Sequence, residues 1–151
     1  MKQIIFVCLG NICRSPMAEM MMKQLVAEKG LSEEIQIQSR ATSTYEIGNS
    51  PHPGAIRELQ KQNIPIVEHA AKQITTADFD KADVVIGMDQ QNILDLKQMA
   101  PVSDQAKVHL AYEIVGKADE VQDPWYDHKF DRTYRQLKEL LPLWLDKVIS
   151  N

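Results

Sequence analysis

Short apolar runs alternate with stretches of helical spacing along this chain. Residues 3–8 and 83–88 are nearly continuous apolar runs, residues 34–39 alternate polar and apolar positions, and residues 107–112 form a weaker run. Runs of this kind indicate β-strands. Helical spacing follows over residues 15–30, 55–62, 90–99 and 130–149. The alternation predicts right-handed crossovers and an α/β fold, a single three-layer α/β/α domain over residues 1–151 with a four-stranded parallel, Rossmann-like sheet.

Local signals mark where the helices begin and bend. Ser15 and Pro16 predict the start of the first helix, with Ser15 as the N-cap and Pro16 at the first helical position. Residues 40–54 and 113–127 contain several of the residue types that favour turns, so both are predicted to be loops. Pro142 falls inside the last helical stretch and predicts a kink there.

Composition and charge limit the classes of protein that this chain can be. Hydrophobic residues make up 44% of it and charged residues 25%, which is typical of a globular domain. A net charge of −4 argues against nucleic-acid binding. No apolar run approaches the roughly 20 residues of a membrane span, so we expect no membrane insertion. The signal-peptide pattern is incomplete, which predicts a cytoplasmic protein, with release by a route that needs no signal peptide as the alternative.

The two cysteines and four histidines do not form a metal-binding pattern. Cys8 and Cys13 are too few for a disulfide framework or a four-thiolate zinc site. The histidines, at positions 52, 69, 109 and 128, lack the spacing of zinc ligands. The sequence therefore predicts that the protein uses neither a metal nor a cofactor, and that its thiols are reduced.

The segment that follows the first strand, residues 8–15, contains the candidate chemistry. In an open α/β sheet, ligands bind at the carboxyl ends of the strands, and Cys8 stands where the first strand ends. A loop that leads into a helix points free N–H groups and the positive end of the helix dipole inward, which creates an anion site. Arg14 offers a planar fork to phosphate oxygens. Gly10 and Asn11 tolerate the unusual backbone angles of such a loop.

Cys8 in this setting is predicted to be a nucleophile toward phosphorus. The positive field of the loop favours the thiolate, which is the reactive form of the side chain. The alternative is a buried cysteine with no chemical role, which is common at the end of a strand. Arg14 at this offset, together with the glycine, the strand and the helix start, favours the nucleophile.

The low-molecular-weight protein tyrosine phosphatases have a signature that residues 7–16 of this chain resemble, Val-Cys-Leu-Gly-Asn-Ile-Cys-Arg-Ser-Pro. The resemblance covers nearly the whole chain. Further matching segments are residues 41–49, His69, residues 73–75, residues 88–89 with Asn92, and residues 123–126. The resemblance implies a phosphotyrosine phosphatase I-like fold. It also implies hydrolysis of phosphotyrosine and small aryl phosphates without a cofactor.

The resemblance implies three catalytic residues. Cys8 corresponds to the nucleophile that forms a cysteinyl-phosphate intermediate, and Arg14 to the residue that binds the phosphoryl oxygens. Asp123 corresponds to the general acid that protonates the leaving phenolate and then to the base that activates water. Without the resemblance, Asp123 and Pro124 would be interpreted as a solvated loop dipeptide.

The resemblance also implies a substrate site and a supporting network. The substrate site consists of Leu9, Gly10, Asn11, Ile12, Cys13, Tyr45, Trp125 and Tyr126. The supporting network behind the loop includes Asn11 with Ser15, Ser39, His69 and Asp89. Simpler interpretations exist: Ser15 and Asp89 as helix caps, and His69 as an ordinary histidine. Many family members have two tyrosines after Asp-Pro, and this chain has Trp125 in the first of those positions.

Cys13 lies in the same segment as Cys8, and the family resemblance implies that the two form a disulfide under oxidants. Such a bridge would protect the nucleophile from irreversible oxidation and would make the enzyme redox-regulated. The alternative is a small apolar side chain beneath the loop.

Four other functions are weaker predictions. Protein-arginine phosphatases resemble this chain but have Thr at the position of Ile12. Thioredoxin-coupled arsenate reductases need further cysteines, which this chain lacks. A non-catalytic phosphotyrosine-binding module would have a damaged catalytic set, and a nucleotide-binding loop would be Gly-rich and contain Lys. The expected partners are therefore tyrosine-phosphorylated proteins or peptides, with phosphate and similar oxyanions as small ligands.

Overall fold

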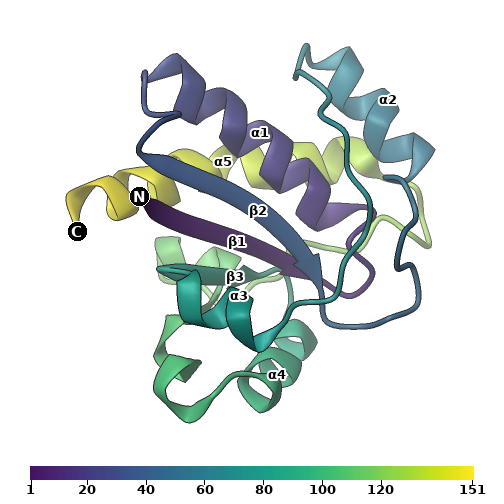
Figure 1. The fold of residues 1–151 in the computed structure, drawn as a ribbon. Helices are drawn as coiled ribbons and strands as arrows, with labels where there is room; N and C mark the ends of the chain where they lie inside the picture. The colour runs from purple at the N-terminus through teal and green to yellow at the C-terminus, as the bar shows by residue number, and fades with distance from the viewer.

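The four strands form one all-parallel sheet in the order β2-β1-β3-β4 (Figure 1). The computed structural model describes residues 1–151. The strands are β1 (Lys2–Cys8), β2 (Ile35–Ala41), β3 (Val84–Gly87) and β4 (Val108–Leu110). The predicted α/β fold with a four-stranded parallel sheet is confirmed.

Helices cover both faces of the sheet (Figure 1). One face packs against α1 (Arg14–Glu28), α2 (Pro53–Lys61) and α5 (Phe130–Ser150), and the other against α3 (Thr76–Lys81) and α4 (Gln90–Met99). Two 3-10 helices, η1 (Val102–Lys107) and η2 (Ala111–Val115), flank β4. None of the helices combines the length and the apolar character that a membrane span requires.

Alternate residues of β1 belong to two separate apolar cores. Ile4 and Phe6 pack into the larger core, beneath α1 and α5, whereas Ile5 and Val7 pack into the smaller one, beside α3 and α4. All four side chains are fully buried, as expected for a central strand of a parallel sheet. Each such burial stabilises the fold by roughly 1.5–3 kcal/mol. The position of β1, and with it Cys8, is therefore fixed from both faces.

The boundaries of several elements differ from the prediction. Helix α1 begins at Arg14 with Cys13 as its N-cap, so Ser15 is not the cap and Pro16 is not the first helical residue. The reason is that the Ser15 hydroxyl lies against the Cys8 sulfur and makes no cap hydrogen bond. Pro16 still falls in the first turn, where a backbone N–H would have no partner within the helix.

Three short helices, α3, η1 and η2, were not predicted, and β4 is shorter than predicted. Helix α3 has only six residues, too few to show periodicity, and its one local signal is the capping box between Thr75 and Asp78. Strand β4 is three residues long instead of six because the chain turns into η2 at Ala111. The segment predicted to be a loop over residues 113–127 begins with the rest of η2.

The order of the strands places the site. The chain leaves β1 toward β2 on one side and later returns to β3 on the other side, so the strand order reverses at β1. Connections that leave a parallel sheet in opposite directions open a crevice at the carboxyl ends of the strands. Cys8 is the last residue of β1 and pairs with Ala41, the last residue of β2.

Candidate active site

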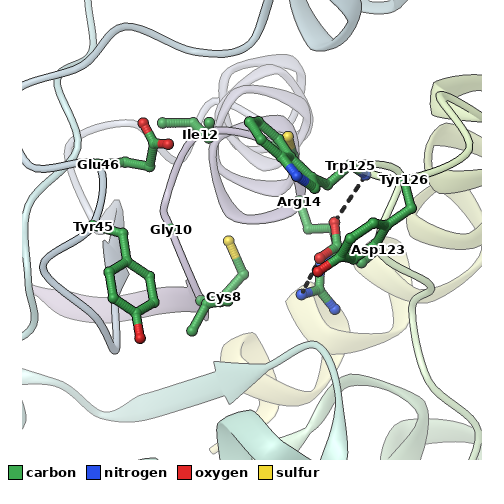
Figure 2. A pocket seen from close by; sticks show the side chains of 11 residues that line it. Cys8, Gly10, Ile12, Arg14, Tyr45, Glu46, Asp123, Trp125 and Tyr126 are labelled. Atoms are coloured by element: carbon green, nitrogen blue, oxygen red, sulfur yellow. Dashed lines mark hydrogen bonds and ion pairs between the residues drawn. The ribbon is translucent and has the colours of Figure 1, made fainter.

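A pocket of about 270 Å³ opens at the carboxyl end of β1. Three segments far apart in the sequence form its walls: the 8–15 loop, the loop after β2, and the loop before α5 (Figure 2). The lining residues are Cys8, Leu9, Gly10, Ile12, Cys13, Arg14, Tyr45, Glu46, Asp123, Trp125 and Tyr126. Ten of these eleven residues were predicted site residues, and Glu46 is the addition.

The backbone of the 8–15 loop takes its shape from Asn11 and Gly10 in different ways. Asn11 has a φ of 60°, in the left-handed region that Asn adopts more readily than most residues. Gly10 was expected to have unusual backbone angles too, but it lies outside that region. Its lack of a side chain instead allows Glu46 to lie close to the loop, because a Cβ at Gly10 would lie 3.3 Å from Cγ of Glu46.

The Cys8 sulfur is almost fully buried, with only 3% of the residue exposed, and it lies 3.0 Å from the Ser15 hydroxyl oxygen. Asn11 Nδ2 donates one hydrogen bond to Ser15 Oγ at 2.8 Å and one to Ser39 Oγ at 3.0 Å. Because the Ser15 oxygen accepts from Asn11, its single hydrogen can donate either to the sulfur or to the backbone oxygen of Arg40, which lies farther away at 3.4 Å. The hydroxyl is thus within hydrogen-bonding distance of the sulfur and can stabilise negative charge there.

Asn11 uses all of its hydrogen-bonding groups other than its backbone N–H in this network. Its side-chain oxygen accepts from the backbone N–H of Lys72 at 3.1 Å, and its backbone oxygen lies 3.0 Å from Nε2 of His69. The 8–15 loop is thereby tied to the 69–72 segment. His69 and Ser39 both contact Asn11 of this loop.

Glu19 also belongs to this network and was missed by the sequence analysis. Its carboxylate is buried on α1, accepts from the Ser39 hydroxyl, pairs with Lys23 at 2.6 Å, and lies 3.7 Å from Nδ1 of His69. The sequence signal for a buried carboxylate was one acidic residue in the largely apolar stretch of residues 17–22. The helix buries this whole stretch. A buried carboxylate needs partners of this kind.

Arg14 is held in the pocket by acidic groups from two other segments. Its Nη1 donates to Asp89 Oδ2 at 2.8 Å and to the backbone oxygen of Val121 at 2.9 Å, and its Nη2 lies 3.7 Å from Asp123 Oδ2. Burial by itself lowers the pKa of Arg14, but Cys8, Asp89 and Asp123 outweigh it and raise the pKa above its ordinary value. The guanidinium therefore stays charged in an almost dry position.

Asp89 has two roles at once. Its side chain caps α4 by accepting from the backbone N–H of Asn92 at 2.8 Å, and it orients the Arg14 guanidinium. Asn92 completes a capping box with the Asp89 backbone. The sequence left two interpretations of Asp89 open, a helix cap and a neighbour of Arg14. The structure shows both contacts.

The loop before α5 brings Asp123 and two aromatic side chains to the mouth of the pocket. The Asp123 side chain is 32% exposed, and its Oδ1 accepts from the backbone N–H of Trp125 at 3.0 Å. Trp125 and Tyr126 stand on this side of the pocket, and Tyr45 stands on the opposite side (Figure 2). Tyr126 is 84% exposed, so the walls of the entrance present aromatic surface to solvent.

Cys13 lies in the same pocket as Cys8, and both thiols are free. Burial, followed by the charges of Cys8 and Asp123, raises the pKa of Cys13 to about 12. At neutral pH this side chain is therefore a neutral thiol. No group of three or more His, Cys, Asp or Glu side chains in the structure has the arrangement of a metal site.

Comparison with known proteins identifies the family. The family model described as low molecular weight phosphotyrosine protein phosphatase matches residues 3–151. The chain belongs to that family. This phosphatase is 38% identical over 155 residues to the human low molecular weight phosphotyrosine protein phosphatase, with 97% of this chain and 96% of the relative covered. Membership makes it a protein-tyrosine phosphatase whose substrates are phosphorylated proteins.

Solved structures agree with the fold of this phosphatase. The crystal structure of YfkJ from Bacillus subtilis is 34% identical with a TM-score of 0.94, covering 99% of this chain and 96% of that one. The crystal structure of an arginine phosphatase from drosophila is 28% identical with a TM-score of 0.88, covering 97% of each chain. The fold and the family predicted from the sequence are thus confirmed for this phosphatase.

Proposed function

We propose that this phosphatase hydrolyses phosphotyrosine through a cysteinyl-phosphate intermediate, with Cys8 as nucleophile, Arg14 as phosphate clamp and Asp123 as general acid and base. The observation that supports this most strongly is the convergence of these three side chains on one pocket at the N-terminus of α1. A helix N-terminus, a buried guanidinium and a thiol together provide a binding site for an anion and a nucleophile.

In the first step, the Cys8 thiolate attacks phosphorus and a phosphorus–sulfur bond forms. The bond between phosphorus and the phenolic oxygen breaks, and Asp123 gives its proton to that oxygen, so a neutral tyrosine leaves. Arg14 and the backbone N–H groups of the loop bind the phosphoryl oxygens, on which charge is concentrated. Asp123 is half-exposed at the mouth of the pocket, where the leaving group would lie.

In the second step, water attacks phosphorus and the phosphorus–sulfur bond breaks. Asp123, now a carboxylate, takes a proton from the water, and inorganic phosphate is released. The electron pair of the broken bond returns to Cys8 as a thiolate. The Ser15 hydroxyl, 3.0 Å from the sulfur, is placed to stabilise this leaving group.

The shape of the pocket supports an aryl phosphate substrate. Tyr45 on one side and Trp125 with Tyr126 on the other form apolar walls between which an aromatic ring fits. A phosphoserine side chain is too short to use these walls. Ile12 adds apolar surface where a guanidinium would require polar partners, which favours phosphotyrosine over phosphoarginine, the alternative suggested by the arginine phosphatase of similar fold.

Cys13 supports a redox role for the same pocket. Peroxide would oxidise the Cys8 thiolate to a sulfenic acid, and the Cys13 thiol would then attack that sulfur, with loss of water and formation of a disulfide. Both cysteines are free and line one pocket, which supports this reaction.

The experiment that tests the proposal measures phosphate release from phosphotyrosine, phosphoserine and phosphoarginine peptides at mildly acidic pH. We expect turnover of the phosphotyrosine peptide, no turnover with Cys8→Ser, and slowing by about 10²-fold or more with Asp123→Ala. Binding of the peptide by the wild type without turnover would indicate a capture module. Preference for the phosphoarginine peptide would leave the proposed mechanism standing but would show that phosphotyrosine is not the preferred substrate.

A further inference from the structure

His52 connects two walls of the pocket although it does not line the pocket itself. It is half-buried and immediately precedes α2. Its backbone N–H donates to the backbone oxygen of Ile12 at 2.8 Å, so the 8–15 loop is tied to His52. None of the proposed chemical steps uses this residue.

The imidazole of His52 is fixed by contacts on several sides. Its Nδ1 accepts from the backbone N–H of Gly54 at 2.9 Å, which caps α2. The ring stacks on Phe130, at the start of α5, with centroids 5.0 Å apart and an angle of 29° between the planes. Gly54 permits this packing, because a Cβ there would lie 2.2 Å from Phe130. An imidazole held in this way is a rigid support for whatever packs against its free side.

Trp125 packs against that free side. Its indole meets the imidazole edge-on, with centroids 5.6 Å apart and an angle of 80° between the planes. Edge-to-face aromatic pairs stabilise a contact by roughly 0.5–1.5 kcal/mol beyond the area that they bury. The indole is otherwise nearly half exposed. His52 is thus the ring that supports it from the side of the 8–15 loop.

Trp125 is hydrogen-bonded to Asp123 through its backbone. The backbone N–H of Trp125 donates to Asp123 Oδ1 at 3.0 Å, and Asp123 Oδ2 lies 3.7 Å from Arg14. The contacts therefore form a closed path, from Ile12 through His52 and Trp125 to Asp123 and back to the 8–15 loop at Arg14. The link from the indole to the carboxylate runs through the backbone of Trp125, whose N–H makes the hydrogen bond to Asp123.

We propose that His52 is a positioning residue that holds Trp125, and through it the carboxylate of Asp123, in register with the 8–15 loop. This inference rests on the proposed role of Asp123 as general acid. It concerns a residue that touches neither the substrate nor the reacting atoms. The Trp125 indole and the His52 imidazole act together as one support for the acid.

The protonation state of His52 agrees with this role. An Nδ1 that accepts from Gly54 carries no proton, so the ring is neutral with its proton on Nε2. Burial lowers the pKa of His52, and the charges of His128 and Arg57 lower it further, against a smaller opposite effect of Glu46. The remaining rings against it, Trp125 and Phe130, are uncharged. The imidazole therefore takes up a proton at a lower pH than a free histidine does.

Leaving-group dependence tests the proposal. A general acid matters most when the leaving oxygen is strongly basic, so kcat/KM is compared for phenyl phosphate and p-nitrophenyl phosphate. His52→Asn keeps a cap acceptor and loses the ring, whereas His52→Phe keeps a ring and loses the acceptor. We expect His52→Asn to lose about tenfold more kcat/KM on phenyl phosphate than on p-nitrophenyl phosphate, in the direction of Asp123→Ala, and His52→Phe to lose much less.

A double-mutant cycle tests the path through Trp125. If His52 acts through the indole, His52→Asn has no further effect on kcat/KM in a Trp125→Ala background. Additive effects of the two substitutions would overturn the proposal. So would an equal loss on both substrates with His52→Asn, because that result indicates general damage to the fold.

Fluorescence provides a readout that is independent of the chemistry. Trp144 is 1% exposed, so acrylamide quenching reports on Trp125. We expect faster quenching in His52→Asn than in the wild type or in His52→Phe. Unchanged quenching would refute the positioning role even if Asp123 is the acid. Changed quenching with no leaving-group effect in Asp123→Ala would instead refute the proposed acid and leave the contact between His52 and Trp125 intact.

Discussion

The Ser15 hydroxyl oxygen lies 3.0 Å from the Cys8 sulfur and accepts a hydrogen bond from Asn11. The Ser15 proton then has two acceptors within reach, the sulfur at 3.0 Å and the backbone oxygen of Arg40 at 3.4 Å. In the proposed mechanism, a hydroxyl in this position stabilises the thiolate both before it attacks phosphorus and when it leaves.

Replacing Ser15 by Ala should therefore slow catalysis more than it weakens binding. We expect kcat to fall by about 10²-fold with a small change in KM, because the lost donor acts on charge that develops during the reaction. Steady-state kinetics on a phosphotyrosine peptide measure both quantities. Ser103→Ala, at an exposed position far from the pocket in sequence, is the matched control. A kcat equal to the wild type in Ser15→Ala would show that the contact has no catalytic role.

Two substitutions at Asp89 should separate its two roles. Asp89→Ser keeps a side-chain acceptor for the N-cap of α4 and removes the partner of Arg14, whereas Asp89→Ala removes both. We expect Asp89→Ala to lower the free energy of unfolding by about 1 kcal/mol more than Asp89→Ser does. Both should lower kcat/KM by about tenfold, since the guanidinium loses the contact that orients it. Urea unfolding and steady-state kinetics measure the two effects, and retention of full activity by Asp89→Ser would contradict the orienting role.

Gly54→Ala should destabilise the fold by about 1–3 kcal/mol because the new methyl group meets the ring of Phe130. The ideal Cβ position lies 2.2 Å from that ring, so the start of α5 has to shift. Thermal or urea unfolding gives the free energy, with Gln60→Ala at an exposed position of the same helix as control. Unchanged stability in Gly54→Ala would mean that α2 and α5 separate easily here.

The stability of the protein should fall in acid partly because of His52. The pKa of His52 is lowered in the folded state by burial and by His128 and Arg57, from an ordinary value of 6.5. As pH falls through 6.5, the unfolded chain binds a proton before the folded one does, so the free energy of unfolding decreases. The contribution stops changing below the folded pKa. Melting temperatures from pH 8 to pH 5 should therefore fall more steeply for the wild type than for His52→Asn, and parallel curves would contradict this.

Peroxide should form a disulfide between Cys8 and Cys13 that a dithiol reverses. Activity lost by the wild type should return almost fully on reduction, and mass spectrometry should find the 8–13 bridge. In Cys13→Ser we expect irreversible loss and a sulfinic or sulfonic acid at Cys8. Overoxidised Cys8 without a bridge in the wild type would refute the protective role.

Much of the site could be predicted because its centre is local in the sequence. Cys8 and Arg14 are separated by one short loop, and a strand that leads through a glycine into a helix is visible without any tertiary information. The parallel sheet followed from the alternation of strands and helices. Asp123 is 109 residues beyond Arg14 in the sequence, and only the family resemblance linked the two.

The residues that were missed depend on tertiary packing. Glu19 acts through Ser39, which α1 reaches only by packing on β2, and no local pattern records that pairing. Glu46 enters the pocket because its loop folds over Gly10. His52 was considered only as a zinc ligand, and its partners Ile12 and Trp125 come from distant parts of the sequence. The assignment of Ser15 as a cap was wrong because the helix begins at Arg14, one residue before Ser15, and the Ser15 oxygen accepts from the Asn11 side chain.

Asn11 has a further consequence for the energetics of the reaction. Its amide hydrogens are directed to Ser15 and Ser39, and its two oxygens are occupied by the Lys72 N–H and by His69. The amide therefore cannot flip without breaking several hydrogen bonds, and the dipoles behind the sulfur keep one orientation throughout the cycle. In the proposed mechanism, charge that moves between Cys8 and phosphorus thus meets an environment that is already polarised, with a smaller reorganisation energy than mobile water would give.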